Sequence, residues 1–284
     1  MKVNLEKLQK EVVVALFKAL ETHDLLGIKG EEIVQKNQFG DVAVRADIEA
    51  ENAVLNHLKS IEIPVRVISE EHGQVDITPH PQFLGILDGI DGSAIYKIAR
   101  SKGRYSTMFG IFQGLNPKYK DYLISGIMEH ATKRLFVASR GKGAWLIKNN
   151  QNLPIKIPQT DPLNRKTKIY IDNYLEAEKN IYRDILSKKF PNSCNDTSGS
   201  STNYLDVILG AYDAYIEYTK KQNLEKAVAY GLIKEAGGVM IGINGNDLGS
   251  AKYFEFGQKE AVPVITAATQ KLAKQILKEV ILRK

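Results

Sequence analysis

Apolar residues recur along the chain at two different spacings, and these spacings predict which segments form helices and which form strands. From residue 4 to residue 26 they recur every three or four positions, as in an amphipathic helix. The same spacing predicts helices over residues 48–60, 176–188, 202–209, 224–236 and 269–282. Short apolar runs closed by turn residues predict strands at 63–68, 83–87, 106–114, 122–129, 134–138, 169–171, 211–218, 239–243 and 262–267.

The order of these segments predicts two halves. The strands between residues 106 and 138 follow one another with hairpin-like connections, which predicts an antiparallel sheet flanked by helices. The polar stretch from Lys148 to Lys168 contains three prolines and is the best candidate for a boundary. We therefore expect an N-terminal half over residues 1–150 and a C-terminal half over residues 151–284.

Composition narrows the class of protein. The chain has 284 residues, of which 43% are hydrophobic and 25% charged, as in ordinary globular proteins. No apolar run approaches the ~20 residues that span a bilayer, so we expect no membrane partner. The start of the chain lacks the apolar block of a signal peptide, and the single cysteine, Cys194, fits a reducing compartment, so a cytoplasmic location is expected.

The net charge of +6 raises the question of nucleic-acid binding. The lysines are spread along the chain, and the last cluster lies on the predicted C-terminal helix, where a solvated helix face explains them better. We therefore expect no nucleic-acid partner, although the positive excess could favour a small anionic substrate.

Carboxylates follow two of the apolar strands. Asp88 and Asp91 come after the run 83–87 and precede a Gly-Ser step, so hard oxygen ligands stand beside exposed backbone N–H groups. That combination suits a divalent cation and a phosphate held together. Aspartates favoured in a turn for their own hydrogen bonds are the alternative. Glu70, after the run 63–68, adds the further carboxylate expected at a site for two Mg²⁺ ions.

Other polar residues have simpler interpretations when they are taken one at a time. Asp47 stands where the N-cap of the helix over residues 48–60 would stand. His72 has no partner at ligand spacing and is interpreted as a turn or surface residue, and Cys194 as an inert small side chain.

Taken in order, the motifs resemble the inositol monophosphatase family, whose relatives include fructose-1,6-bisphosphatases and 3′-phosphoadenosine-5′-phosphate phosphatases. The resemblance covers nearly the whole chain and rests on Glu70-Glu71, on the run from Asp88 to Ser93, and on Glu225 ahead of Glu235-Ala236-Gly237-Gly238. It implies an α/β (α+β) fold, a layered α-β-α-β-α sandwich. It also implies Mg²⁺-dependent hydrolysis of a phosphate monoester of a small polyol or sugar, with fructose-1,6-bisphosphatase or 3′-phosphoadenosine-5′-phosphate phosphatase activity as the alternative.

The resemblance also implies roles for particular residues. Glu70, Asp88 and the Ile90 carbonyl would hold one Mg²⁺; Asp88, Asp91 and Glu225 would hold a second; and Glu70 would help to bind a third, with Mn²⁺ as a substitute. The attacking water would be oriented and deprotonated by Asp47, Ser93 and Glu70. The phosphate would be held by the backbone N–H groups of Gly92 and Ser93, and Lys36 would lie near this phosphate.

The substrate would be a small phosphorylated polyol, sugar or nucleotide. Its alcohol part would contact Gly199, Ser200, Ser201 and Glu217. The alternative for these residues is an ordinary helix N-cap and a solvated strand end. Lys220 and Lys221 either bind a second phosphate or are exposed lysines of a loop. A homodimer and sensitivity to lithium are expected from the resemblance alone.

The chain departs from the family pattern at several positions. Gly89 replaces a proline, Ser93 a threonine, and Ala94-Ile95-Tyr96 the usual x-Asn-Phe. Leu224-Glu225 replaces Trp-Asp, and the extra methylene of glutamate moves the carboxylate by ~1.5 Å, about one C–C bond. A non-catalytic relative that binds metal or phosphate is therefore the alternative from another functional class.

Overall fold

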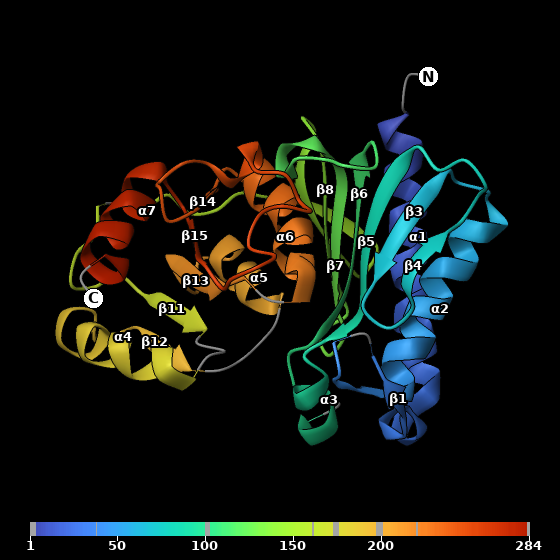
Figure 1. Cartoon of the computed structure of the whole chain (residues 1–284), viewed down its shortest axis with the longest axis horizontal. Helices are drawn as coiled ribbons and strands as arrows, with labels where there is room; N and C mark the ends of the chain where they lie inside the picture. The colour runs from blue at the N-terminus through green and yellow to red at the C-terminus, as the bar shows by residue number, and fades with distance from the viewer. Residues whose placement is uncertain are drawn as a thin grey trace.

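Two large β-sheets, a small two-stranded sheet and the surrounding helices make up the described part of the molecule (Figure 1). The computed structural model describes residues 4–37, 39–99, 103–160, 162–172, 176–196, 201–219 and 221–282. The first sheet has eight strands in the order β10-β9-β8-β7-β6-β5-β3-β4. They are β3 (Val65–Ser69), β4 (Gly73–Asp76), β5 (Phe83–Asp91), β6 (Ser106–Gln113), β7 (Tyr122–Glu129), β8 (Arg134–Ser139), β9 (Gly143–Lys148) and β10 (Gln151–Ile155).

The second sheet has five strands in the order β12-β11-β13-β15-β14. They are β11 (Ile169–Asp172), β12 (Cys194–Asp196), β13 (Ala214–Tyr218), β14 (Val239–Ile241) and β15 (Pro263–Ala267). A separate hairpin joins β1 (Ile33–Lys36) to β2 (Val42–Val44). The α-helices are α1 (Leu5–Leu26), α2 (Arg45–Ser60), α3 (Ser93–Ala99), α4 (Glu176–Lys189), α5 (Thr202–Ile208), α6 (Leu224–Glu235) and α7 (Gln270–Ile276), which continues as a π-helical turn over Leu277–Ile281.

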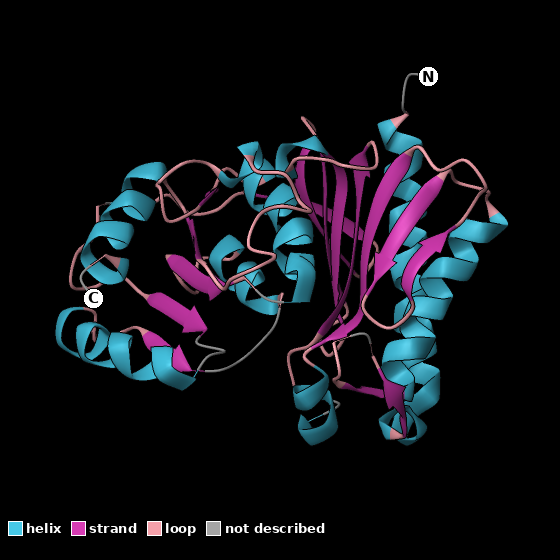
Figure 2. Cartoon of the chain, viewed as in Figure 1, coloured by secondary structure: helices cyan, strands magenta, loops and turns pink. Residues whose placement is uncertain are grey.

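Helices and sheets alternate as layers across the molecule (Figure 2). Helices α1 and α2 cover one face of the first sheet, and α5 and α6 lie between the two sheets. Helices α4 and α7 pack on the outer face of the second sheet. The predicted α-β-α-β-α sandwich is therefore confirmed.

The apolar face of α1 illustrates how the sequence pattern produces this packing. Leu8, Val12, Leu16 and Leu20 recur every four residues and are buried against the first sheet. The side chain of Asn4 accepts a hydrogen bond from the Lys7 N–H at 3.0 Å and caps the helix.

The first sheet is antiparallel, as expected, except that β3 and β5 run parallel. Both therefore deliver their carboxyl ends, with Glu70 and Asp91, to the same edge of the sheet. Strand β10 pairs with β9, so the chain leaves this sheet after residue 155. The division into halves at residues 150 and 151 stays a prediction.

The structure differs from the sequence-based expectation at several short elements. Helix α2 begins at Arg45 rather than at residue 48, so the N-cap assignment of Asp47 was wrong. Asp47 lies at the third helical position, where its Oδ2 accepts the Val44 N–H at 2.9 Å. Residues 194–196, which lie outside the strands predicted from the sequence, form strand β12 beside β11. Strands β4 and β10 were missed because neither carries a buried apolar run.

None of the helices within the described residues is long and apolar enough to cross a membrane.

Candidate active site

The carboxyl end of β5 contains a β-bulge. Asp88 pairs with Met108 and Asp91 pairs with Ser106, so Gly89 and Ile90 together stand opposite Thr107. In a regular strand, residues three positions apart point to opposite faces of the sheet. The extra residue changes that alternation, as bulges beside active sites commonly do. Asp88 and Asp91 consequently act on one another electrostatically.

Four carboxylates gather at this edge of the sheet. Glu70 follows β3, Asp88 and Asp91 end β5, and Glu225 lies in the first turn of α6; their exposed fractions are 7%, 3%, 6% and 4%. Burial, followed by the negative charges of Glu70, Asp91 and Glu225, holds the pKa of Asp88 well above its usual range. Residues from three separate segments therefore form one buried, strongly negative cluster.

A buried glutamate that sequence reasoning missed holds the turn that carries Glu70. Glu51 on α2 accepts the N–H of Glu70 at 3.1 Å, the hydroxyl of Ser69, and the imidazole Nδ1 of His72 at 2.7 Å. Its position four residues after Asp47, on the same face of α2, was the available signal. His72 lies in the turn as expected, and its hydrogen bond to Glu51 raises the pKa of the imidazole.

The hairpin of β1 and β2 closes against the same turn. Asn37 Nδ2 donates to Glu70 Oε1 at 3.3 Å and to Glu71 Oε1 at 3.2 Å, and Gln35 Nε2 donates to the Glu71 carbonyl at 3.4 Å. Asn37 was also missed, and a lone asparagine after a short strand carries no distinctive pattern. Lys36 lies between these two residues with an exposed side chain, and its role at the phosphate stays a prediction.

The predicted water-orienting pair meets at the start of α3. The hydroxyl of Ser93 lies 3.4 Å from Asp47 Oδ1 and 3.1 Å from the Ile90 carbonyl oxygen. Burial, with the charges of Glu71 and Glu70, holds the pKa of Asp47 well above its usual value. Gly92 has φ +100°, and a Cβ there would lie 3.1 Å from Tyr105 Cβ, so this step favours glycine.

The residues predicted to contact the substrate are only partly described. Gly199, Ser200 and Lys220 lie outside the described residues. The Ser201 N–H donates to Asp91 Oδ2, which ties the start of α5 to the end of β5. Glu217 is buried rather than a solvated strand end: Tyr204 donates its hydroxyl proton to Glu217, and Lys226 Nζ lies 3.1 Å from Glu217 Oε2.

The donor set suits a hard divalent cation such as Mg²⁺ or Mn²⁺, because its side-chain oxygens come from carboxylates alone. Asp88 Oδ1 is buried and has no hydrogen-bond partner among the described residues, and a cation would satisfy it. Within the described residues, no three of these side chains already converge on one point as a preformed metal site. The residues therefore fit the ion in charge and chemistry.

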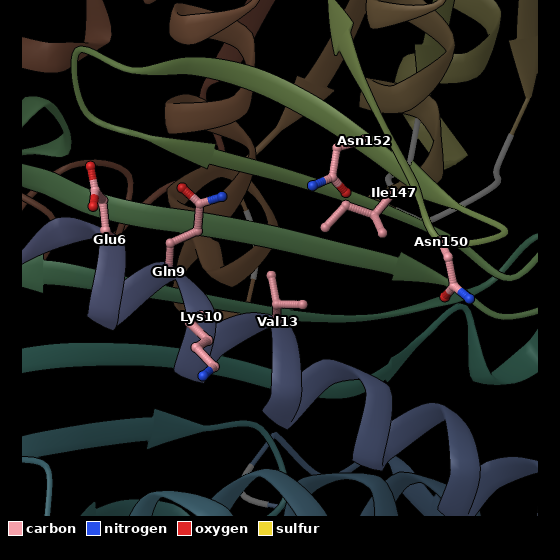
Figure 3. Close-up of a pocket in the computed structure, with 7 residues that line it drawn as sticks. All are labelled: Glu6, Gln9, Lys10, Val13, Ile147, Asn150 and Asn152. Atoms are coloured by element: carbon pink, nitrogen blue, oxygen red, sulfur yellow. The ribbon is translucent and has the colours of Figure 1, made fainter.

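A separate hollow of about 420 Å³ lies between α1 and the β9–β10 hairpin (Figure 3). Glu6, Gln9, Lys10 and Asn152 are among its lining residues, and none of the clustered carboxylates is. This hollow is distinct from the carboxylate cluster.

Two curated proteins are similar to the chain over most of its length. A bifunctional NADP phosphatase/NAD kinase of Methanococcus maripaludis is 27% identical over 238 residues, which cover 78% of this chain and 40% of that protein. The chain thus spans less than half the length of that relative. A fructose-1,6-bisphosphatase/inositol-1-monophosphatase of Methanothermobacter thermautotrophicus is 25% identical over 228 residues, covering 76% of this chain and 77% of that protein.

Solved structures share the fold at lower identity. A hypothetical protein of Pyrococcus horikoshii, described as having similarities to inositol-1 monophosphatase, superposes with a TM-score of 0.72 at 20% identity, covering 98% and 99% of the two chains. An inositol monophosphatase of Thermotoga maritima gives a TM-score of 0.76 at 16% identity, covering 98% and 97%. The family model of the inositol monophosphatase family matches residues 2–281. With this match over nearly its whole length, the chain belongs to the inositol monophosphatase family.

Proposed function

We propose that the chain is a Mg²⁺-dependent phosphatase that hydrolyses a phosphate monoester of a small polyol, sugar or nucleotide. The observation that carries this proposal is the cluster of four buried carboxylates, in which Asp88 Oδ1 is buried and has no hydrogen-bond partner among the described residues. A buried cluster of this kind is costly unless cations neutralise it, and its oxygens are the ligands that Mg²⁺ prefers.

Glu70, Asp88 and the Ile90 carbonyl would hold one ion, and Asp88, Asp91 and Glu225 a second, with Glu70 assisting a third. When bound, Mg²⁺ lowers the pKa of a water molecule and neutralises charge on the phosphate and the leaving oxygen. Because Glu70, Asp91 and Glu225 all act electrostatically on Asp88, Asp88 is the residue best suited to belong to both sites.

The chain's own residues would position the water and the phosphate. The hydroxyl of Ser93, within reach of Asp47 and the Ile90 carbonyl, would direct its oxygen at the attacking water while Glu70 accepts the water's proton. The backbone N–H groups of Gly92 and Ser93 would hold phosphate oxygens, and Lys36 would add positive charge. This arrangement supports an in-line displacement by water without a covalent nucleophile.

On the leaving-group side, Gly199, Ser200, Ser201 and Glu217 would contact the alcohol. The curated relatives act, by name, on NADP and on fructose 1,6-bisphosphate or inositol 1-phosphate. These compounds and 3′-phosphoadenosine 5′-phosphate therefore form the first panel of candidate substrates.

A phosphate-release screen over this panel tests the proposal. We expect release with Mg²⁺, loss of release after chelation, and recovery when Mg²⁺ or Mn²⁺ is restored. Asp91→Asn should abolish release while keeping the hydrogen bond from Ser201 and the fold, as checked by circular dichroism. The matched control Asp76→Asn, at an exposed pair with Arg66, should retain release. Turnover by Asp91→Asn would contradict the site assignment.

A non-catalytic metal- or phosphate-binding relative is the second candidate, favoured by Leu224-Glu225 in place of the family's Trp-Asp. Calorimetry with Mg²⁺ separates the two functions: metal binding without turnover on any substrate would support the non-catalytic one. Lithium inhibition, a homodimer and a cytoplasmic location also stay predictions. The first two are measured by adding LiCl to the assay and by sedimentation, and the third by cell fractionation.

A further inference from the structure

A buried chain of hydrogen bonds runs from the bulge of β5 to a histidine outside the carboxylate cluster. The hydroxyl oxygen of Thr107 lies 2.6 Å from the Gly89 carbonyl oxygen and 2.8 Å from His130 Nε2. Thr107 is fully buried and His130 is 2% exposed. These two hydrogen bonds therefore link the backbone of Gly89, between Asp88 and Ile90, to the side chain of His130, which follows β7.

The chemistry of the three atoms assigns their protons. The Gly89 carbonyl can only accept, so the Thr107 hydroxyl donates to it. The Thr107 oxygen must then accept from His130, which requires a proton on Nε2. Nδ1 of His130 is buried without a hydrogen-bond partner among the described residues, which fits the neutral Nε2–H tautomer.

The histidine is itself held in place. Its ring stacks on Tyr105 with centroids 5.5 Å apart, and it lies 4.4 Å from the ring of His23. The backbone N–H of His130 also donates to the backbone carbonyl of Tyr105 at 3.2 Å. Burial, followed by the neighbouring His23, holds the pKa of His130 well below its usual value, so the ring stays neutral near pH 7.

Gly89 is held from the other side by α2. A Cβ on Gly89 would lie 2.2 Å from the Asp47 carbonyl oxygen, so the residue must be glycine. Glycine has the widest conformational freedom, and the family's proline is missing here. A hydrogen bond to the Gly89 carbonyl is therefore an effective way to restrict the backbone that presents Asp88, Ile90 and Asp91.

We propose that Thr107 and His130 are positioning residues that orient the Asp88–Asp91 bulge for metal binding. The proposal rests on the proposed function, since it concerns the same candidate metal site. Neither side chain has to touch the ion or the substrate, and both act through the Gly89 carbonyl.

The test compares two variants of Thr107. Thr107→Val removes the hydroxyl at nearly constant volume, and Thr107→Ser retains it. We expect the dissociation constant for Mg²⁺, measured by calorimetry, to rise roughly 10- to 100-fold in Thr107→Val, as is typical when a side chain behind a metal ligand is lost. Thr107→Ser should remain near wild type.

A matched control and a spectroscopic readout separate positioning from general damage. Thr266→Val removes another buried threonine hydroxyl, one with no hydrogen-bond partner among the described residues, and should leave Mg²⁺ affinity unchanged. The ring ¹⁵N shifts of His130 should report the Nε2–H tautomer in wild type and Thr107→Ser, and a changed Nε2 environment in Thr107→Val. If Thr107→Val does not fold, His130→Gln, which keeps an N–H donor, is compared with His130→Leu.

Each outcome decides a separate point. Weaker Mg²⁺ binding in Thr107→Val, restored in Thr107→Ser, supports the positioning role. Equal Mg²⁺ affinity in wild type and Thr107→Val overturns it. Absence of Mg²⁺ binding by the wild type would overturn the proposed function instead, while the His130 spectra would still establish or refute the hydrogen-bonded chain.

Discussion

At the scale of single residues, Glu51 decides how Glu70 is presented. The turn after β3 bends sharply, and its backbone N–H groups point toward α2, where the Glu51 carboxylate accepts those of Glu70 and Glu71. Burial raises the pKa of Glu51, against the opposing effect of the hydrogen bonds from His72 and Ser69. One carboxylate thus satisfies several donors that would otherwise be buried without acceptors.

We predict that Glu51→Gln lowers the free energy of unfolding by about 1–3 kcal/mol, because an amide cannot accept all of these hydrogen bonds. Urea denaturation measures the loss. Glu49→Gln on the same helix, at a partly exposed position, serves as the control and should change stability by less than about 0.5 kcal/mol. Equal stability of the two variants would show that Glu51 does not hold the turn.

At the scale of elements, the bulge of β5 and the first turn of α2 are in direct backbone contact. The close approach of Gly89 to the Asp47 carbonyl brings Ser93 and Asp47 within hydrogen-bonding reach. The glycine that departs from the family's proline is therefore required by packing in this chain.

Gly89→Ala should destabilise the protein by about 1–3 kcal/mol, since the new methyl group overpacks the contact with the Asp47 carbonyl. Thermal unfolding followed by circular dichroism measures the effect. Gly242→Ala is the matched control, because a Cβ there would meet its nearest neighbour at an ordinary 3.6 Å. A wild-type melting temperature for Gly89→Ala would refute the close contact.

At the scale of the whole molecule, Arg104 connects the first sheet to helix α5, which lies between the two sheets. It precedes β6, donates through Nε to Glu129 of β7 at 2.8 Å, and pairs through Nη1 with Asp206 of α5. Glu129 is fully buried and also pairs with Arg134. Arg104, held by Glu129, therefore helps to fix the position of α5 through Asp206. The start of α5 also contacts Asp91, through the Ser201 N–H.

Arg104→Ala should lower the free energy of unfolding by about 1–2 kcal/mol, less than for a fully buried pair because Arg104 is 37% exposed. Arg66→Ala, which removes an exposed pair with Asp76, should cost less than about 1 kcal/mol. Chemical denaturation of both variants checks the difference. A larger loss for Arg66→Ala would contradict the bridging role of Arg104.

The sequence by itself predicted most of the helices and strands and the candidate carboxylates, and the resemblance carried by its motifs implied the layered fold. Each of these predictions depends on local periodicity or on short motifs such as Asp88-Gly89-Ile90-Asp91. Both kinds of pattern involve residues that are close together in the sequence. The N-cap assignment of Asp47 was wrong because α2 begins at Arg45, three residues earlier than predicted. Asp47 lies within the first turn, where its side chain accepts the Val44 N–H.

Only the tertiary structure decided how the carboxylates are held. The bulge is a mismatch between β5 and β6, so it cannot be read from either strand alone. Glu51, Asn37 and Thr107 reach the site by hydrogen bonds to residues 18 to 33 positions away, and Glu217 meets Lys226 across a strand and a helix. Hydrogen bonding depends on distance and direction in space, and these arise only when the layers pack.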